Sequence, residues 1–154
     1  MGLWDWALGA YARPNVAAAC LALQDGHGQN APLLLAAAWA ASEGRTLELD
    51  RAVALTKAWE GDVVAPLRAA RRGLKMSSKP IPDAGREALR ETVKAVELEA
   101  ERLLLGALES LAWPGDAAEV EPALTAAAAR WSAAKNLSPP PTNGITALSL
   151  ALLG

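Results

Sequence analysis

The sequence predicts an all-α protein, folded as a single compact helical bundle of six or seven helices. Alanine supplies 36 of the 154 residues and leucine 25, and both are strong helix formers. Valine and isoleucine together supply nine and phenylalanine is absent, so the residue types that sheets need are scarce. The net charge of -2 and 52% hydrophobic content exclude a disordered chain, and a single cysteine excludes a disulfide scaffold.

The same composition predicts a bacterial protein of the cytoplasm with no membrane span. Residues 1–11 lack the basic and apolar regions of a signal peptide. The longest uncharged apolar run, residues 31–41, is too short for a bilayer, which takes about 20 residues. The lone Cys20 fits a reducing compartment. Ten arginines against five lysines, with abundant alanine, indicate a GC-rich bacterial gene.

Two helices are predicted before residue 27. The first covers residues 3–12 and ends at Arg13, because a residue before proline avoids the α region. Its expected core stripe is Trp4, Leu8 and Tyr11. The second opens at Pro14 and closes at Gly26, which is the expected C-cap. Its expected core stripe is Val16, Cys20 and Leu23.

The third helix is predicted to be the central one. Asn30 is its expected N-cap, Pro32 is tolerated in its first turn, and Gly44 ends it. Residues 33–41 contain no polar side chain, and a helix that is apolar all round is buried on most sides. Trp39 is expected to anchor its second half.

The fourth helix is predicted to be interrupted. Thr46 or Asp50 would cap it, and one stripe runs through it: Leu55, Trp59, Val63, Leu67, Ala70 and Leu74. Gly61 weakens the helix, and Pro66 removes a backbone donor, so we expect a kink or a break near Asp62. Residues 76–82, with two prolines and two serines, are a predicted linker.

One long helix is predicted at residues 84–112, capped by Asp83 and ended by Pro114-Gly115. Its apolar residues recur at spacings of four and three, as in a coiled-coil seam. The seam is Leu89, Val93, Val96, Ala100, Leu103 and Ala107.

A last helix is predicted to start at Asp116. Its expected core face is Val120, Leu124, Ala127, Trp131 and Ala134. Residues 1–137 would then form the helical domain, and residues 138–154 a Pro-rich linker followed by a short apolar tail. Residues 138–144 are expected to be extended. The tail, residues 145–153, either docks on the bundle or belongs to an interface.

Charge is unevenly distributed along the chain. Residues 57–82 carry six basic and two acidic side chains, net +4, and residues 83–121 carry ten acidic and four basic, net -6. Either two neighbouring helices pair these charges, or a basic face binds an acidic partner or nucleic-acid phosphates.

The most polar predicted loop is residues 24–30, which joins two apolar helices, and its candidate binding residues are Gln24, Asp25, His27 and Asn30. Asp25 could orient His27 for acid–base chemistry, and the following helix N-terminus could receive an anion. The alternative is that His27 is a solvated or capping residue.

Glu97 and Glu101 lie four residues apart, on one face of the predicted long helix. Di-iron bundles use such glutamates together with Glu-x-x-His motifs, and none occurs here, so we expect no metal and no cofactor. The alternative is a solvated face or a partner for the basic helix.

That basic helix carries Arg68, Arg71, Arg72 and Lys75 along one side. Guanidinium groups bind phosphate and carboxylate bidentately, so the cluster is a candidate anion or nucleic-acid site. No nucleic-acid motif accompanies it, and the isoelectric point is about 5.4.

An interface is predicted at Trp6 and in the tail. Trp4 and Trp6 cannot share one helix face, so Trp6 is expected to be partly exposed, and an exposed tryptophan marks a partner surface. The tail would contribute Ile145, Leu148 and Leu152.

Several segments, taken together, resemble a proteobacterial family of small, uncharacterised helical proteins. They are residues 3–8, 11–14, 19–25 with His27-Gly28, 33–35, 66–68 with Arg71-Arg72, and 97–102, so the resemblance covers about residues 3–105. It implies a cytoplasmic bacterial protein and no particular activity.

No catalytic motif is recognised, so the leading expectation is a noncatalytic binding or adaptor protein that contacts another protein or a second copy of itself. One alternative is an anion or nucleic-acid binder that uses residues 68–75. Another is a small-molecule or metal enzyme that uses Asp25, His27, Glu97 and Glu101.

Overall fold

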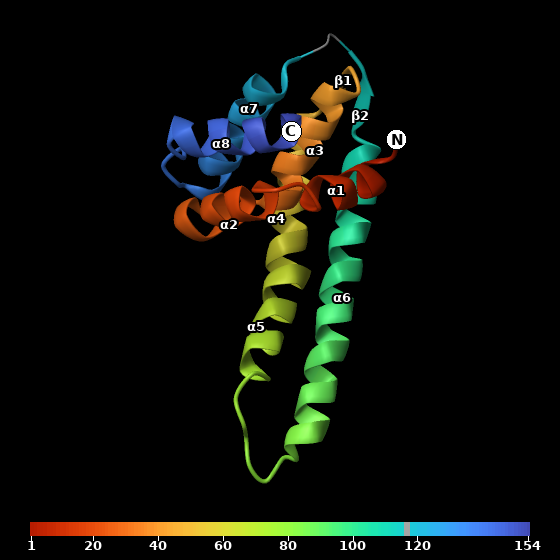
Figure 1. Ribbon diagram of the computed structural model, residues 1–154, viewed down its shortest axis with the longest axis vertical. Coiled ribbons are helices and arrows are strands. Elements are labelled where there is room, and N and C mark those ends of the chain that lie inside the picture. Colours follow the sequence, from red (N-terminus) through yellow and green to blue (C-terminus); the bar gives the residue numbers. More distant parts are fainter. Residues whose placement is uncertain (116–117) are drawn as a thin grey trace. The chain divides into compact units, whose positions relative to one another are not determined.

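The computed structural model describes residues 1–115 and 118–154, and it confirms the all-α class (Figure 1). The helices are α1 (Leu3–Tyr11), α2 (Val16–His27), α3 (Ala31–Ser42), α4 (Leu49–Trp59), the π-helical turn η1 (Glu60–Val64), α5 (Ala65–Gly73), α6 (Asp83–Glu109), α7 (Val120–Lys135) and α8 (Thr142–Leu153). Two short strands, β1 (Arg45–Leu47) and β2 (Ala112–Pro114), pair antiparallel. The segments α4, η1 and α5 are continuous, so the described residues form seven helical rods.

The chain divides into two compact units. Met1–Ala54 and Leu105–Gly154 form the terminal unit, and Leu55–Leu104 form the hairpin unit. Each unit is described by itself below.

Helix α3 is the centre of the terminal unit, as predicted. Ten of its twelve residues are buried, and α1, α2, α7 and β1 all pack on it. Asn30 caps it, because its Oδ1 accepts a hydrogen bond from the Leu33 amide at 3.0 Å. The five alanines after Leu35, interrupted only by Trp39, let the neighbouring elements approach closely.

The predicted stripe of α1 is wrong. Leu3, Ala7 and Ala10 face the core, whereas Leu8 and Tyr11 are exposed. Helix α1 packs against the alanine-rich α3 through this face, on which Leu3 is the one large side chain.

The predicted stripe of α2, which is Val16, Cys20 and Leu23, is confirmed. The predicted C-cap is wrong, because α2 continues to His27 and ends at Gly28, whose φ of +63° is the left-handed conformation that favours glycine. Residues 24–27, predicted as loop, are therefore helical.

The strand pair is the element that the sequence did not predict. Arg45 pairs with Pro114 and Leu47 with Ala112, so Thr46 lies in a strand and is not a helix cap. Asp50 lies in the first turn of α4 rather than before it. The pairing also ends the long helix early, at Glu109 rather than at residue 112.

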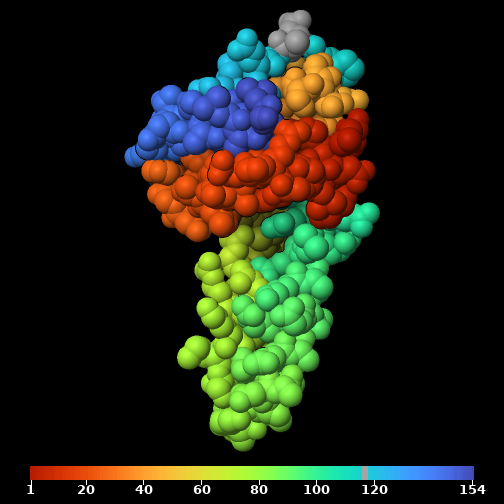
Figure 2. Space-filling model, in the orientation of Figure 1, coloured from red at the N-terminus to blue at the C-terminus, as the bar shows by residue number. Residues whose placement is uncertain are grey.

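The tail docks on its own terminal unit, which was one of the two predicted alternatives. Helix α8 starts at Thr142, three residues before the predicted tail, and packs on α2 and α7. In the space-filling view the dark blue surface of α8 lies directly against the orange-red surface of α2 (Figure 2). In α7 the expected core residues Leu124, Ala127 and Trp131 are buried, and the prediction that Asp116 begins this helix lies outside the described residues.

The hairpin unit contains the predicted interruption, in the form of the π-helical turn η1. Pro66 follows η1 directly, and the Ala65 amide before it bonds to the Glu60 carbonyl in the π pattern. A π turn changes the register of the backbone hydrogen bonds without ending the helix, so a kink-forming proline is accommodated and Asp62 caps no second piece.

The spacing of the α6 seam was predicted correctly, but three of its six residues lie on the outer face. Leu89, Val96 and Leu103 are exposed. Val93 and Ala100 of the predicted seam are turned inward, but Leu89, Val96 and Leu103 are each replaced there by the residue that follows. The inward residues of α6 in the hairpin unit repeat with the same spacings of four and three: Arg86, Arg90, Val93, Glu97, Ala100 and Leu104. Polar groups occupy this face because their partners, such as Arg71 for Glu97, lie inside the hairpin.

Candidate functional site

Charged side chains lie between α5 and α6 in the hairpin unit. Arg71 of α5 donates a hydrogen bond from its Nε to Glu97 Oε2 of α6 at 2.6 Å, and both side chains are largely buried. A charge-assisted bond at such a short distance is stronger than a neutral one. The sequence-predicted pairing of the basic helix with the glutamates is therefore present for these two residues.

Arg68 and Glu101 form the neighbouring layer of the same interface. Burial raises the pKa of the Glu101 carboxyl above its ordinary value, the positive charge of Arg68 opposes this, and the negative charge of Glu97 adds to it. Burial is the largest of the three effects, so the ionised form of Glu101 is costly inside the hairpin.

We expect Glu101→Gln to stabilise the protein increasingly as pH rises. A carboxyl whose pKa is raised by folding contributes most stability below its unfolded pKa, and that contribution is lost as pH rises through the folded pKa. The wild-type melting temperature should therefore fall relative to Glu101→Gln once pH exceeds the ordinary value of 4.5. Thermal unfolding followed by circular dichroism between about pH 4 and 7 measures this. A difference that shrinks with pH would contradict it.

Arg86 is a structural residue that the sequence analysis missed. Its side chain is only 8% exposed, and its Nη1 donates to the backbone carbonyls of Leu74 at 2.5 Å and Lys75 at 3.1 Å. It therefore satisfies carbonyls at the end of α5, where a helix leaves acceptors unpaired. The only sequence signal for this role of Arg86 was its position about one turn after the linker, from which a long side chain can reach back to the end of α5.

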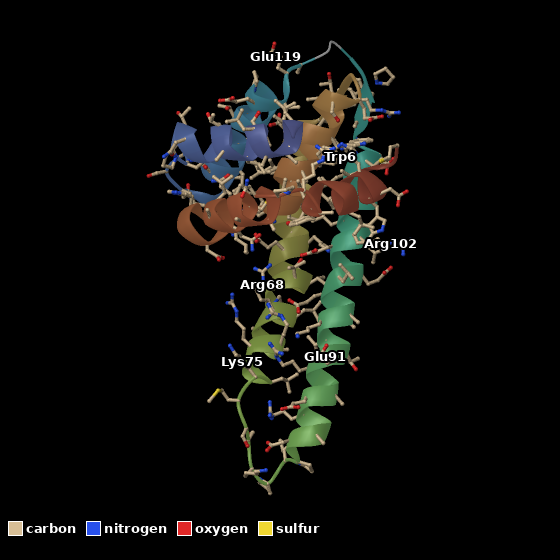
Figure 3. The ribbon with its side chains drawn as sticks, viewed as in Figure 1. Trp6, Arg68, Lys75, Glu91, Arg102 and Glu119 are labelled. Atoms are coloured by element: carbon tan, nitrogen blue, oxygen red, sulfur yellow. The ribbon has the colours of Figure 1, made fainter. Side chains whose placement is uncertain are left out.

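The predicted basic cluster is divided by the fold. Arg71 is committed to Glu97 and Arg68 faces Glu101, whereas Arg72 is exposed. Figure 3 shows Arg68 and Lys75 extending from the α5 side of the hairpin, and Glu91 from α6. Because part of the cluster is neutralised internally, residues 68–75 do not form the continuous basic face that a nucleic acid would need.

The polar residues near the end of α2 have separate roles. Asn30 is buried as the cap of α3, Gln24 is half-buried, and Asp25 and His27 are exposed. Asp25 and His27 belong to the terminal unit, whereas Glu97 and Glu101 belong to the hairpin unit.

Gln29 is a second residue that the sequence analysis missed. It is almost fully buried, and its Nε2 donates to Ser132 Oγ of α7 at 2.9 Å. A glutamine between a glycine and an asparagine gives no sequence signal of burial. Its bond joins the α2–α3 connection to α7, which is a structural role.

The proposed interface residues lie mainly inside the terminal unit. Ile145, Leu148 and Leu152 are buried against its own helices, so they are not exposed to a partner, and the outward apolar residues of α8 are Leu150 and Leu153. Trp6 is half-buried. Cys20 is buried, and burial raises the pKa of its thiol to about 11, which leaves it without a reactive thiolate.

Within residues 1–115 and 118–154, no group of three or more histidine, cysteine, aspartate or glutamate side chains is arranged to hold a metal ion. Within the same residues, no helix is both long and apolar enough to cross a membrane.

Fold and site together define a small all-α protein in which a helical hairpin carries ion pairs between its two helices. The chain belongs to the family described as protein of unknown function DUF2390, which matches residues 2–108. This confirms the resemblance to an uncharacterised family and extends it by a few residues at its C-terminal end. Neither the curated proteins nor the solved structures contain a match.

Proposed function

We propose that this chain is a noncatalytic helical binding protein that acts through protein–protein contacts. The observation that carries the proposal is an apolar stripe on α6, defined as Leu89, Val96 and Leu103, which are 53%, 46% and 57% exposed. A spacing of seven residues keeps them nearly on one side of a helix, as in a coiled-coil seam. Three large apolar side chains aligned in this way are unusual for a surface that only meets water.

We infer that the partner that packs on this stripe is α6 of a second copy of the chain. Val96 lies seven residues from each leucine, so two antiparallel copies related by a two-fold axis at Val96 place each Leu89 opposite a Leu103. The same axis places the exposed Thr92 opposite Ala100 and the exposed Glu99 opposite Val93, so no like charges oppose each other at these flanking positions. The contact is small, so we expect a reversible dimer with a Kd of about 10–100 µM.

The bacterial, cytoplasmic setting also belongs to the proposal. It is supported by the ten arginines against five lysines and by the single buried cysteine.

Charge insertion into the stripe tests the proposal. We expect the wild-type mass in sedimentation velocity to rise from one chain towards two between about 1 and 500 µM. The double variant Leu89→Glu/Leu103→Glu should stay at one chain, because a dimer would bury four unpaired carboxylates. All substituted positions are exposed, so helix content by circular dichroism should not change.

Leu98→Glu is the matched control. Leu98 is 54% exposed on the same helix but lies about 160° around it from Val96, so this variant should dimerise like the wild type. A wild type that remains a single chain throughout, or a double variant that still dimerises, would overturn the proposal. Equal loss of dimer in Leu98→Glu would overturn the assignment to the stripe.

A further inference from the structure

A polar hollow of about 490 Å³ lies in the hairpin unit near the start of α6. Its lining residues are Lys75, Ala84, Arg86, Glu87, Ala88, Arg90 and Glu91. Three of these are cations, and they come from both sides of the linker that joins α5 to α6. None of them is among the residues that the Arg71–Glu97 pair or the Glu101 layer uses.

Arg86 is a fixed cation in this hollow. Its two bonds to the carbonyls of Leu74 and Lys75 hold the guanidinium group in place. Its Nε is buried and has no hydrogen-bond partner among the described residues, and Asp83 Oδ1 lies 3.6 Å from it, beyond hydrogen-bond distance. A buried donor without a hydrogen-bond partner lowers the stability of the folded state by about 1–3 kcal/mol.

Arg90 repeats the pattern one turn later. Its Nε is also buried and has no hydrogen-bond partner in the described part of the chain. The three nearby carboxylates compensate weakly. Asp83 is held by Lys79 at 3.1 Å, Glu87 is 70% exposed and meets Arg86 only at 3.4 Å, and Glu91 is held by Lys94 at 3.1 Å. Lys75 adds a third positive charge to the lining.

We propose that this hollow binds the phosphate group of a small molecule. A phosphate brings a compact double charge and several acceptor oxygens, which matches two guanidinium groups with unused donors and one ammonium group. A nucleic-acid strand fits less well, because Asp83, Glu87 and Glu91 lie around the cations and would repel the neighbouring phosphates of a polyanion.

Titration of the full-length protein with glycerol phosphate and with inorganic phosphate tests the site. Amide chemical shifts followed by NMR should report saturable binding by the wild type below about 10 mM. Arg90→Gln and Lys75→Gln should each weaken binding by about tenfold. Arg72→Gln is the matched control, because Arg72 is an exposed arginine outside the lining, and it should change the affinity less than about twofold. Arg86 is left intact, since it caps α5.

Absence of saturable binding by the wild type would overturn the proposal, as would equal weakening in Arg72→Gln. Tighter binding of a DNA or RNA oligonucleotide than of glycerol phosphate, lost in Arg90→Gln, would assign the hollow to nucleic acid instead and would also overturn it. Because the α6 stripe is not part of the lining, the dimer of the proposed function should be the same with and without phosphate.

Discussion

Trp131→Ala is expected to lower the free energy of unfolding of the terminal unit by about 3–5 kcal/mol. Trp131 is 1% exposed in α7, the helix that packs most extensively on the central α3. Its indole Nε1 donates to the carbonyl of Gly28 at 2.8 Å, so it also ties α7 to the end of α2. Because a domain is stable by only about 5–15 kcal/mol, this loss would remove a large part of the total.

Urea unfolding followed by far-ultraviolet circular dichroism measures the effect. Trp131→Phe keeps much of the apolar surface but leaves the Gly28 carbonyl without its donor, so its cost should be smaller than that of alanine. Trp113→Ala is the matched control, since Trp113 is 46% exposed in β2 and should cost less than about 1 kcal/mol. Equal losses at Trp131 and Trp113 would contradict the burial on which this prediction rests.

The features that sequence predicted well are those fixed by local chemistry. Asn30 caps α3 because an asparagine before an apolar run bonds the amide three residues on, whatever else surrounds it. Residues 33–41 are buried because a helix without a polar face has no side to turn to water. Trp131 was placed on the core face by its spacing from Leu124 and Ala127 alone.

The features that sequence predicted poorly depend on partners distant along the chain. The strand pair joins Thr46 to Trp113, and neither three-residue segment carries a strand pattern of its own. Leu89, Val96 and Leu103 of α6 were predicted wrongly, because the spacing of large apolar residues does not by itself mark the interior. In the hairpin unit the interior is decided instead by Glu97, which pairs with Arg71, and by Arg86, which caps α5.

The candidate site shows the same division. That Arg68 and Arg71 would meet Glu97 and Glu101 was foreseen as one of two alternatives, because adjacent segments of opposite charge attract. Which cations would remain for a ligand could not be foreseen. The cations left for a ligand depend on the turn between α5 and α6, which brings Lys75 and Arg90 to the same hollow. The residues of this turn follow no helical or strand spacing from which the approach could be predicted.

Leu148→Ala is expected to cost about 2–5 kcal/mol and to loosen α8 from the terminal unit. Leu148 is fully buried where α8 packs on α2 and α7, and Ile145 and Leu152 lie on the same face one turn to either side. Removing the central side chain of this row leaves a cavity that its two neighbours cannot fill without moving the helix.

Leu150→Ala provides the comparison within the same helix. Leu150 is 66% exposed, so its truncation should change stability by less than about 0.5 kcal/mol. Urea unfolding gives both values, and limited proteolysis should cut within residues 138–153 faster in Leu148→Ala than in Leu150→Ala. If Leu150 proved the costlier position, α8 would turn its other face to the unit, and Ile145, Leu148 and Leu152 would again be candidates for a partner surface. The predicted order instead makes the face of α8 that carries Ile145, Leu148 and Leu152 part of the core, so these three side chains are not available to a second chain.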